Sequence, residues 1–379
     1  MFIKSDINFM KIKFISIARL FIPLTKPFIT AIRQTTHVDD IIVIMKTDCG
    51  KTGYGSAAAT PAITGETAES IIAAIQQIIA PQLINRDISE LNRLLQLNQN
   101  SIENNTSAKA AIDIALHDLF AQKCGLPLYQ LLGGCQNKLD SCITISMKNV
   151  DDMVIDAKAF VADGFHKIKI KAGSSPSEDI LRVTTIRQAV GDKITLFVDA
   201  NQGWDCKEAI NVIQTFEQRQ LNICLIEQPV KAQSMSHLKY VRSQCKTPII
   251  ADESCFSPMD ALNIATHQIC DGINIKLMKC GGIQNANVIY NIAKTAHMQL
   301  MVGCMLESPI GVAAVASFAL SKPDIRYADL DPIMLIRENY VKGGARLVGN
   351  EIVLSNQPGL GIEGFKQGLT PLCEVKNAL

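Results

Sequence analysis

Three apolar runs in the middle of the chain each end in a carboxylate: Ile194-Thr-Leu-Phe-Val-Asp199, Ile223-Cys-Leu-Ile-Glu227 and Pro248-Ile-Ile-Ala-Asp252. Similar runs carry Lys171 before them and Lys276 after them. Successive runs are spaced by roughly 25 to 30 residues, about the length of one strand, one helix and two short loops. The repeat therefore predicts consecutive strand–helix units that feed one parallel sheet.

Working outward from these runs, we predict an α/β fold built on a modified (β/α)8-type (TIM-like) barrel. The predicted barrel strands are residues 142–146, 167–171, 194–199, 223–227, 248–252, 272–276, 300–304 and 327–331. The barrel is expected to span residues 134–331, preceded by an N-terminal α+β capping domain over 10–133. The C-terminal tail, 332–379, is expected to return to this cap, and residues 1–9 to form a flexible extension.

Two local features are predicted within the cap. Residues 23–36 are polar and rich in proline, and so favour a long loop of the kind that is functional or disordered. A helix with an apolar stripe should begin near Thr106 or Ser107, because either hydroxyl can cap its first turn, and should stop at Gly125-Leu-Pro127.

Composition restricts the class of protein. The formal net charge is +1 and 47% of the residues are hydrophobic, which argues against an extended nucleic-acid or membrane surface. No apolar run reaches the length of a membrane-spanning helix. The twelve cysteines contain no Cys-x-x-Cys pair, which favours free thiols in a reducing cytoplasm.

The strand-end carboxylates of Asp199, Glu227 and Asp252 are predicted to meet at the C-terminal mouth of the barrel. Three carboxylates at one place raise each other's pKa unless a cation lies among them. With only oxygen ligands, the set favours a hard cation such as Mg²⁺ over zinc. The alternative, three solvated loop carboxylates, is disfavoured because each ends a strongly apolar strand.

Lysines are predicted to face this metal site. Lys167, Lys169 and Lys171 alternate along one strand and share one face, which we place inward because an outward face would pack on helices. There, neighbouring ammonium groups and the metal should lower a lysine pKa enough to make a general base. A plain basic edge strand is the alternative. Lys276, four strands further round, would face Lys171 across the barrel, a geometry that suits racemisation or epimerisation.

Two further features are candidates for binding substrate. Asp329 and Asp331 share a face of the last predicted strand and could hold an ammonium group, although capping is the commoner role of an Asp-x-Asp pair. Arg33 in the predicted loop could clamp a carboxylate, or could simply be solvated.

Five motifs are similar to those of the muconate-lactonising-enzyme subgroup of the enolase superfamily. They are Lys169-Ile-Lys171, Asp199-Ala-Asn-Gln-Gly-Trp204, Ile226-Glu-Gln-Pro229, Ala251-Asp-Glu-Ser254 and Asn274-Ile-Lys-Leu-Met-Lys-Cys-Gly-Gly282. The Asp329-Leu-Asp331 pair, the segment from Pro23 to Arg33 and Ser107-Ala-Lys-Ala-Ala111 further resemble the L-Ala-D/L-Glu epimerases, a dipeptide epimerase family that acts on murein peptide.

This resemblance implies a role for each matching residue. One Mg²⁺ per subunit would be held by Asp199, Glu227 and Asp252, with Lys171 and Lys276 as the acid/base pair. Lys169 would contact the substrate carboxylate, and Arg33 the glutamate side chain. Asp329 and Asp331 would bind the dipeptide ammonium, while Thr144, Cys304, Met305 and Leu306 line the site. The family often has serine where this chain has Cys304.

The expected reaction is therefore Mg-dependent epimerisation of L-Ala-L-Glu and L-Ala-D-Glu, by proton transfer between two lysines through an enediolate. A cytoplasmic homo-oligomer with a small dipeptide as partner is expected. The alternative is a cycloisomerase or an o-succinylbenzoate-synthase-like lyase, but Asp329 and Asp331 would repel a dianionic acid. A non-catalytic scaffold would have no use for two lysines that face a metal.

Overall fold

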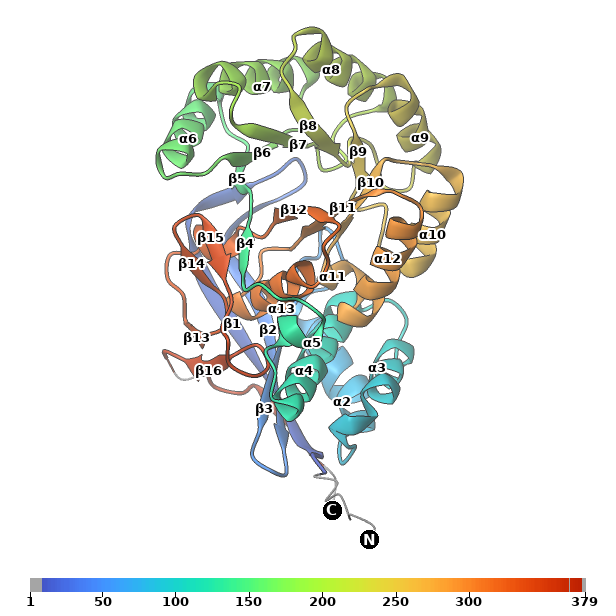
Figure 1. The fold of residues 1–379 in the computed structure, drawn as a ribbon, viewed down its shortest axis with the longest axis vertical. Helices are drawn as coiled ribbons and strands as arrows, with labels where there is room; N and C mark the ends of the chain where they lie inside the picture. Colours follow the sequence, from blue (N-terminus) through green and yellow to red (C-terminus); the bar gives the residue numbers. More distant parts are fainter. Residues whose placement is uncertain (1–8, 368, 377–379) are drawn as a thin grey trace.

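The computed structural model describes residues 9–367 and 369–376. Eight parallel strands form a single sheet, in the order β12-β11-β10-β9-β8-β7-β6-β5, that curves into a barrel (Figure 1). The ring closes where the Cys142 amide donates to the Ala328 carbonyl at 2.9 Å. The strands are β5 (Ile143–Ile145), β6 (Lys167–Lys171), β7 (Thr195–Asp199), β8 (Ile223–Glu227), β9 (Ile249–Ala251), β10 (Gly272–Ile275), β11 (Gln299–Gly303) and β12 (Ile325–Asp329). The predicted barrel is confirmed, with small differences at the strand ends.

Helices cover the outside of the barrel (Figure 1). They are α6 (Val150–Ala162), α7 (Pro176–Val190), α8 (Cys206–Gln218), α9 (Met235–Gln244), α10 (Pro258–His267), α11 (Leu277–Cys280), α12 (Ile283–Thr295), α13 (Pro309–Leu320) and α14 (Pro332–Leu335). In α8, Val212, Ile213 and Phe216 are buried at helical spacing. Asp205 and Glu208 form a capping box that starts this helix.

Along the barrel axis, the side chains that point inward change from apolar to charged. Cys142, Phe197, Leu225, Ile250 and Met301 form a separate buried apolar cluster. Further along the same strands, the inward positions carry charge. The charged groups therefore lie between this apolar layer and the C-terminal mouth.

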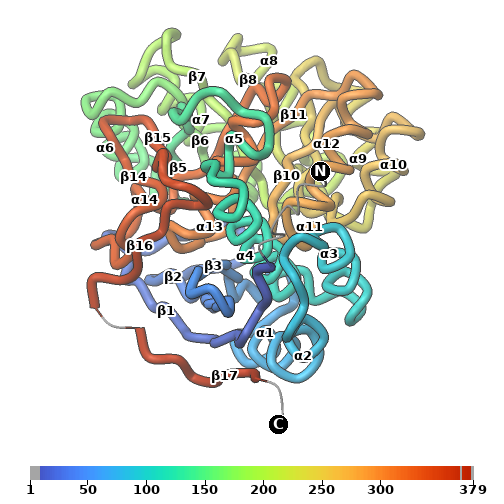
Figure 2. Tube along the Cα trace, turned by 60° about the horizontal axis from the view of Figure 1, so that its bottom comes forward, coloured from blue at the N-terminus to red at the C-terminus, as the bar shows by residue number. Residues whose placement is uncertain are grey.

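The cap contains an antiparallel sheet in the order β17-β1-β2-β3. Figure 2 shows β17, from the C-terminal tail, running along the outer edge of β1. The sheet strands are β1 (Ile12–Ile29), β2 (Gln34–Thr47), β3 (Thr52–Ala58) and β17 (Cys373–Lys376). The remaining strands of the chain are β4 (Lys138–Asp140), β13 (Val341–Gly343), β14 (Arg346–Val348), β15 (Glu351–Val353) and β16 (Ile362–Phe365). The helices are α1 (Ala68–Ala73), η1 (Ala74–Ile79), α2 (Ala80–Leu83), η2 (Ile88–Glu90), α3 (Leu91–Asn100), α4 (Thr106–Cys124) and α5 (Leu128–Leu131).

The prediction of a loop over residues 23–36 is wrong. Strand β1 continues to Ile29 and pairs with β2, with one irregularity between Pro23 and Phe28, so that only a short turn remains. Pairing along the hairpin satisfies backbone groups that local sequence would leave to water. The ammonium of Lys26 also pairs with Asp156 of α6 at 2.8 Å. The hairpin thus carries Arg33, at its turn, to the barrel mouth.

The predicted cap of α4 is also wrong. The helix begins at Thr106, but its N-cap is Asn105, which has a left-handed φ of 46° and makes no side-chain capping bond. Instead, the carboxylate of Glu66 accepts hydrogen bonds from the amides of Ser107 (2.8 Å) and Ala108 (3.1 Å). A residue far away in sequence therefore satisfies the first turn. The predicted end of the helix is confirmed, with Gly125 at the C-cap.

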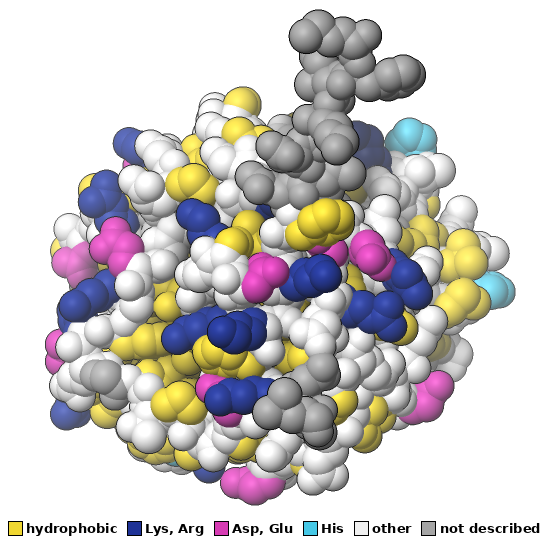
Figure 3. All heavy atoms as spheres, turned by 90° about the horizontal axis from the view of Figure 1, so that it is seen from below, with side chains coloured by type: hydrophobic (Ala, Val, Ile, Leu, Met, Phe, Trp, Pro, Cys, Tyr) yellow, Lys and Arg dark blue, Asp and Glu magenta, His cyan; other side chains and the backbone are white. Residues whose placement is uncertain are grey.

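The surface agrees with a nearly neutral chain. On the face seen from the cap side, lysine and arginine side chains share the surface with acidic and apolar ones (Figure 3). None of the helices in the described residues is long and apolar enough to cross a membrane. The first eight residues of the predicted extension lie outside the described part of the chain.

Candidate active site

The three carboxylates predicted to bind metal meet at the C-terminal ends of neighbouring strands. Asp199 is the last residue of β7, Glu227 is the last of β8, and Asp252 directly follows β9. Asp199 and Glu227 are paired in register, and all three side chains are fully buried. Burying this much negative charge requires cations close by.

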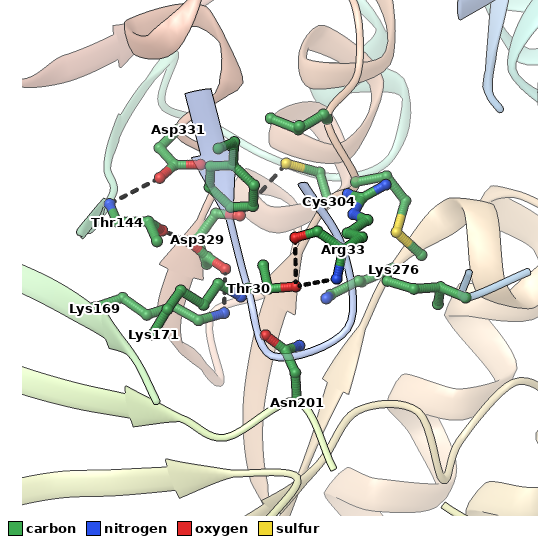
Figure 4. Close-up of a pocket in the computed structure, with 14 residues that line it drawn as sticks. Thr30, Arg33, Thr144, Lys169, Lys171, Asn201, Lys276, Cys304, Asp329 and Asp331 are labelled. Carbon is green, nitrogen blue, oxygen red and sulfur yellow. Dashed lines mark hydrogen bonds and ion pairs between the residues drawn. The ribbon is translucent and has the colours of Figure 1, made fainter. Parts of the chain in front are cut away.

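Lysine side chains supply positive charge from both sides. Lys171 of β6 lies 2.7 Å from Asp199, and Lys276, the residue after β10, lies 2.6 Å from Asp252. Lys169 contacts Glu227 at 2.7 Å and Asp199 at 3.0 Å. Lys171 and Lys276 lie on opposite sides of the pocket, with Asn201 between them (Figure 4).

Lys167 does not join this group. Its ammonium pairs with Asp140 at 2.7 Å, near the start of β6 and away from the carboxylates. The shared face predicted for the three lysines therefore contributes two of them to the site.

The pKa values show how these charges balance. Burial alone would raise the pKa of Asp199 and Asp252, but the adjacent lysines outweigh it and hold both below their usual range. Burial and the charge of Asp199 raise the pKa of Glu227 to about 7. Burial would lower the pKa of Lys276, but Asp252 and Glu227 raise it overall. For Lys276, the two carboxylates therefore outweigh both burial and the charge of Lys169.

The donor set fits a hard divalent cation. Asp199, Glu227 and Asp252 offer only oxygen, as Mg²⁺ prefers. Buried oxygens without a hydrogen-bond donor include Glu227 Oε2, Asp252 Oδ1 and Asn201 Oδ1, although the first two lie within ion-pair distance of lysines. In the described residues, no three His, Cys, Asp or Glu side chains surround one point. Each carboxylate is instead turned towards a lysine.

A pocket opens above the charged groups, with about 460 Å³ of empty space when its open mouth is included. Its wall contains every predicted catalytic and substrate-binding residue, and the carboxylates predicted to bind metal lie beneath. The predicted residues in the wall are Arg33, Thr144, Lys169, Lys171, Lys276, Cys304, Met305, Leu306, Asp329 and Asp331.

Arg33 enters the pocket from the cap. Its side chain is half-buried, and burial lowers the pKa of the guanidinium to about 10. Within the described chain, no carboxylate pairs with this guanidinium. It is therefore available to a ligand carboxylate.

Asp329 and Asp331 approach from the opposite wall. Asp329 ends β12 and accepts a hydrogen bond from Lys169 at 2.6 Å, whereas Asp331 lies beyond the strand and accepts from the Thr144 amide at 2.8 Å. They do not share a strand face as predicted, because the chain has already turned into α14. Burial and the charge of Asp329 raise the pKa of Asp331 to about 6. Asp331 makes no capping bond to α14.

Several residues of the site have no role predicted from the sequence. Lys279 is 1% exposed, and its ammonium lies 2.6 Å from Asp252 Oδ1 and 3.0 Å from the Asn274 carbonyl. The sequence signal was a second lysine in an apolar segment, three residues after Lys276. The other wall residues without an assigned role are Phe28, Thr30, Ile63 and Asn201.

Replacing Lys279 by methionine should lower the free energy of unfolding by about 3 to 5 kcal/mol, because it leaves the buried Asp252 with one cation fewer. Urea unfolding measures this change. The control is Lys138→Met, since Lys138 pairs with Glu351 at 3.7 Å on the exposed surface and should have little effect. Equal losses in the two variants would contradict the role given to Lys279.

Comparison with known proteins agrees with this geometry. Residues 15–133 match the mandelate racemase / muconate lactonizing enzyme N-terminal domain, and residues 152–366 match the enolase C-terminal domain-like family. The chain is 46% identical to an L-Ala-D/L-Glu epimerase from Clostridium acetobutylicum, over 94% of this chain and 99% of that one.

Two solved structures are similar throughout. One is a substrate-liganded complex of the L-Ala-D/L-Glu epimerase from Bacillus subtilis, with a TM-score of 0.93, 40% identity and coverage of 94% of this chain and 100% of that one. The other is a dipeptide epimerase from Enterococcus faecalis complexed with Mg and L-Leu-L-Tyr, with a TM-score of 0.90, 40% identity and coverage of 93% and 99%. The chain therefore belongs to the dipeptide epimerases of the mandelate racemase / muconate lactonizing enzyme family, within the enolase superfamily.

Proposed function

We propose that the protein epimerises the C-terminal residue of a dipeptide, interconverting L-Ala-L-Glu and L-Ala-D-Glu. The observation that carries this proposal is the placement of Lys171 and Lys276 on opposite sides of one pocket (Figure 4). Each lysine is paired with a buried carboxylate, Lys171 with Asp199 and Lys276 with Asp252. Two bases that face each other can remove a proton from one face of a carbon and return it to the other.

We propose Asp199, Glu227 and Asp252 as the ligands of one Mg²⁺. When bound there, Mg²⁺ would supply positive charge that stabilises the dianion left when the α-proton leaves the substrate. The Mg-containing Enterococcus faecalis relative supports this assignment. The buried oxygens that lack a donor support it as well.

The chain's own residues hold the dipeptide and move the proton. Lys171 takes the α-proton from one epimer while Lys276 protonates the other face, and the roles reverse for the other epimer. Lys169, between the carboxylates and the pocket, is placed to contact the substrate carboxylate. Holding the α-carbon between the two lysines, one as the neutral amine that takes the proton and the other as the ammonium that donates one, turns the transfer into an intramolecular step.

The two ends of the pocket are proposed to bind the dipeptide ammonium group and the glutamate side chain. Asp329 and Asp331 provide carboxylates for the dipeptide ammonium, with Thr144 and residues 304–306 as the surrounding wall. These two carboxylates would repel a dicarboxylic acid without an amine, which argues against the cycloisomerase or lyase alternative. The guanidinium of Arg33 provides a positive charge that can pair with the carboxylate of a glutamate side chain.

We propose a reducing cytoplasm as the cellular setting. All twelve cysteines are free in the structure, which supports a reducing cytoplasm. Turnover of murein peptide and assembly as a homo-oligomer are proposed from the family resemblance. A division into cap (10–133 and 332–379) and barrel (134–331) is proposed from the strand and helix pattern of the sequence.

The first test is proton NMR of L-Ala-L-Glu with the protein and Mg²⁺ in D₂O. Loss of the glutamate α-proton signal together with growth of L-Ala-D-Glu signals is expected. Exchange of the α-proton of another dipeptide, but not of Ala-Glu, would support the epimerisation reaction and contradict Ala-Glu as the substrate. No exchange across a panel of dipeptides would favour the alternative reaction.

Arg33→Ala should raise the KM for L-Ala-L-Glu by about tenfold to a hundredfold, because the glutamate carboxylate loses a charge-assisted hydrogen bond. The KM for a dipeptide with a neutral C-terminal residue should change little. Steady-state kinetics on both substrates measures the difference, and Arg33→Lys, which keeps the charge, serves as the matched control. Equal losses on both substrates would show that Arg33 does not select glutamate.

A further inference from the structure

Behind the pocket wall lies a second group of buried carboxyls, away from the metal-ligand residues. Glu307 follows the wall residues 304–306 and is 1% exposed, and Asp40 of β2 is fully buried. One oxygen of each, Glu307 Oε2 and Asp40 Oδ1, has no hydrogen-bond partner among the described residues. Two buried unpartnered carboxyl oxygens are costly unless one of them carries a proton.

The other oxygen of each carboxyl group accepts hydrogen bonds from nearby residues. Glu307 Oε1 accepts a hydrogen bond from the Met305 amide at 2.8 Å, so the side chain folds back onto its own loop. Asp40 Oδ2 accepts from the Ser308 amide at 2.7 Å and from the Ser56 hydroxyl at 2.5 Å. Asp40 thus accepts a hydrogen bond from Ser308, the residue just before α13. The positive end of the helix dipole favours a negative charge at this position.

Packing leaves Glu307 little freedom to move away. A Cβ at Gly311, in the first turn of α13, would lie 2.4 Å from Glu307 Oε2. The carboxyl group is therefore enclosed between its own loop and the start of the helix. Asp40 lies on β2, the strand that begins just after Arg33, so the two carboxyls connect both walls of the pocket.

The charges around Glu307 favour its neutral form. Burial and the charge of Asp40 raise the pKa of Glu307 to about 8, although the Met305 amide and Lys276 oppose the shift. Burial and the charge of Asp39 raise the pKa of Asp40, which the hydroxyls and amide of Ser56 and Ser308 oppose. Asp40 is the better placed of the two to hold the negative charge, since it accepts two hydrogen bonds and lies at the helix start.

We propose that Glu307 is a positioning residue that, as a neutral carboxylic acid near the charge of Asp40, holds the 304–306 wall against the hairpin carrying Arg33. The effect on catalysis rests on the proposed function, but the protonation of Glu307 does not. Neutral Glu307 keeps the Met305 amide bonded without placing a second charge beside Asp40. When Glu307 ionises, the two carboxylates repel and the wall loosens.

The first experiment compares the free energy of urea unfolding of the wild type and Glu307→Gln between pH 5 and pH 9. An acid whose pKa is raised by folding makes the folded state less stable as pH rises from the unfolded to the folded pKa. Glutamine cannot ionise, so Glu307→Gln should become more stable relative to the wild type from about pH 5 to pH 8. A pH-independent difference would overturn the proposal.

Asp40 provides the control for the pair. The Asp40→Asn background removes the negative charge near Glu307. In this background, the difference in free energy of unfolding between Glu307 and the Glu307→Gln variant should depend less on pH. Asp39→Asn is the matched control, because Asp39 points to the other face of β2 and pairs with Arg19 at 2.6 Å. An equal reduction in both backgrounds would contradict the pairing with Asp40.

The second experiment tests positioning by kinetics. Glu307→Leu removes the acceptor of the Met305 amide and should raise the KM for the dipeptide about tenfold above that of Glu307→Gln, with a smaller change in kcat. Above pH 8 the KM of the wild type should rise more than that of Glu307→Gln. Equal KM values for the leucine and glutamine variants would reject positioning. If no dipeptide is turned over, the proposed function fails while the unfolding comparison still decides the protonation of Glu307.

Discussion

Replacing Lys276 by alanine is expected to lower the rate of epimerisation by about 10² to 10⁴-fold, the usual contribution of a positioned acid or base. Lys171→Ala should cause a loss of similar size. The two variants should differ in what they retain. Because the lysines face opposite sides of the pocket, each variant should still exchange the α-proton of one epimer with solvent D₂O, and the two should retain opposite epimers.

Proton NMR of each dipeptide epimer in D₂O distinguishes these outcomes. Lys138→Ala, a surface lysine paired with Glu351, is the control and should retain both activities. Isothermal titration with Mg²⁺ shows whether either active-site variant has lost the metal as well, since both lysines contact metal-ligand carboxylates. Exchange of the same epimer by both variants would contradict a two-base reaction.

Removing Mg²⁺ with a chelator should reduce turnover by about 10³-fold or more, because several kcal/mol of charge stabilisation are lost and each 1.4 kcal/mol corresponds to tenfold. Adding Mg²⁺ back should restore the rate. The cation should also raise the melting temperature of the wild type, since it binds the folded state through three buried carboxylates.

Asp252→Asn gives the matched variant for this prediction. It keeps the shape of the side chain but removes one charge, so it should weaken Mg²⁺ binding and reduce the rise in melting temperature. Differential scanning calorimetry with and without Mg²⁺ measures this without any substrate. An unchanged response to Mg²⁺ in Asp252→Asn would show that the cation binds elsewhere.

Much of the barrel was predictable because its signal is local and repeated. Strands β6 to β10 and β12 each end at or next to a lysine, an aspartate or a glutamate. Parallel strands deliver their ends to one mouth, so Asp199, Glu227 and Asp252 could be placed together without coordinates. The same rule placed Lys171 opposite Lys276.

The errors arose where a partner distant in sequence decides the local structure. The hairpin around Pro23 was predicted as a loop because its own residues favour turns, whereas pairing with β2 keeps it extended. Glu66 caps α4 from forty residues away, so no nearby residue signals it. Asp331 leaves the strand because α14 begins there, which a period-two pattern does not reveal.

By itself, the sequence determined the architecture, the chemical nature of the metal site and the identity of the two opposed lysines, because these depend on strand periodicity and on residue type. Only the tertiary structure decided the ionisation of the buried groups. Lys279 beside Asp252, and Asp40 beside Glu307, are brought together by packing between separate elements. Their charge depends on desolvation and on distances of a few ångströms, which the order of residues along a chain does not contain.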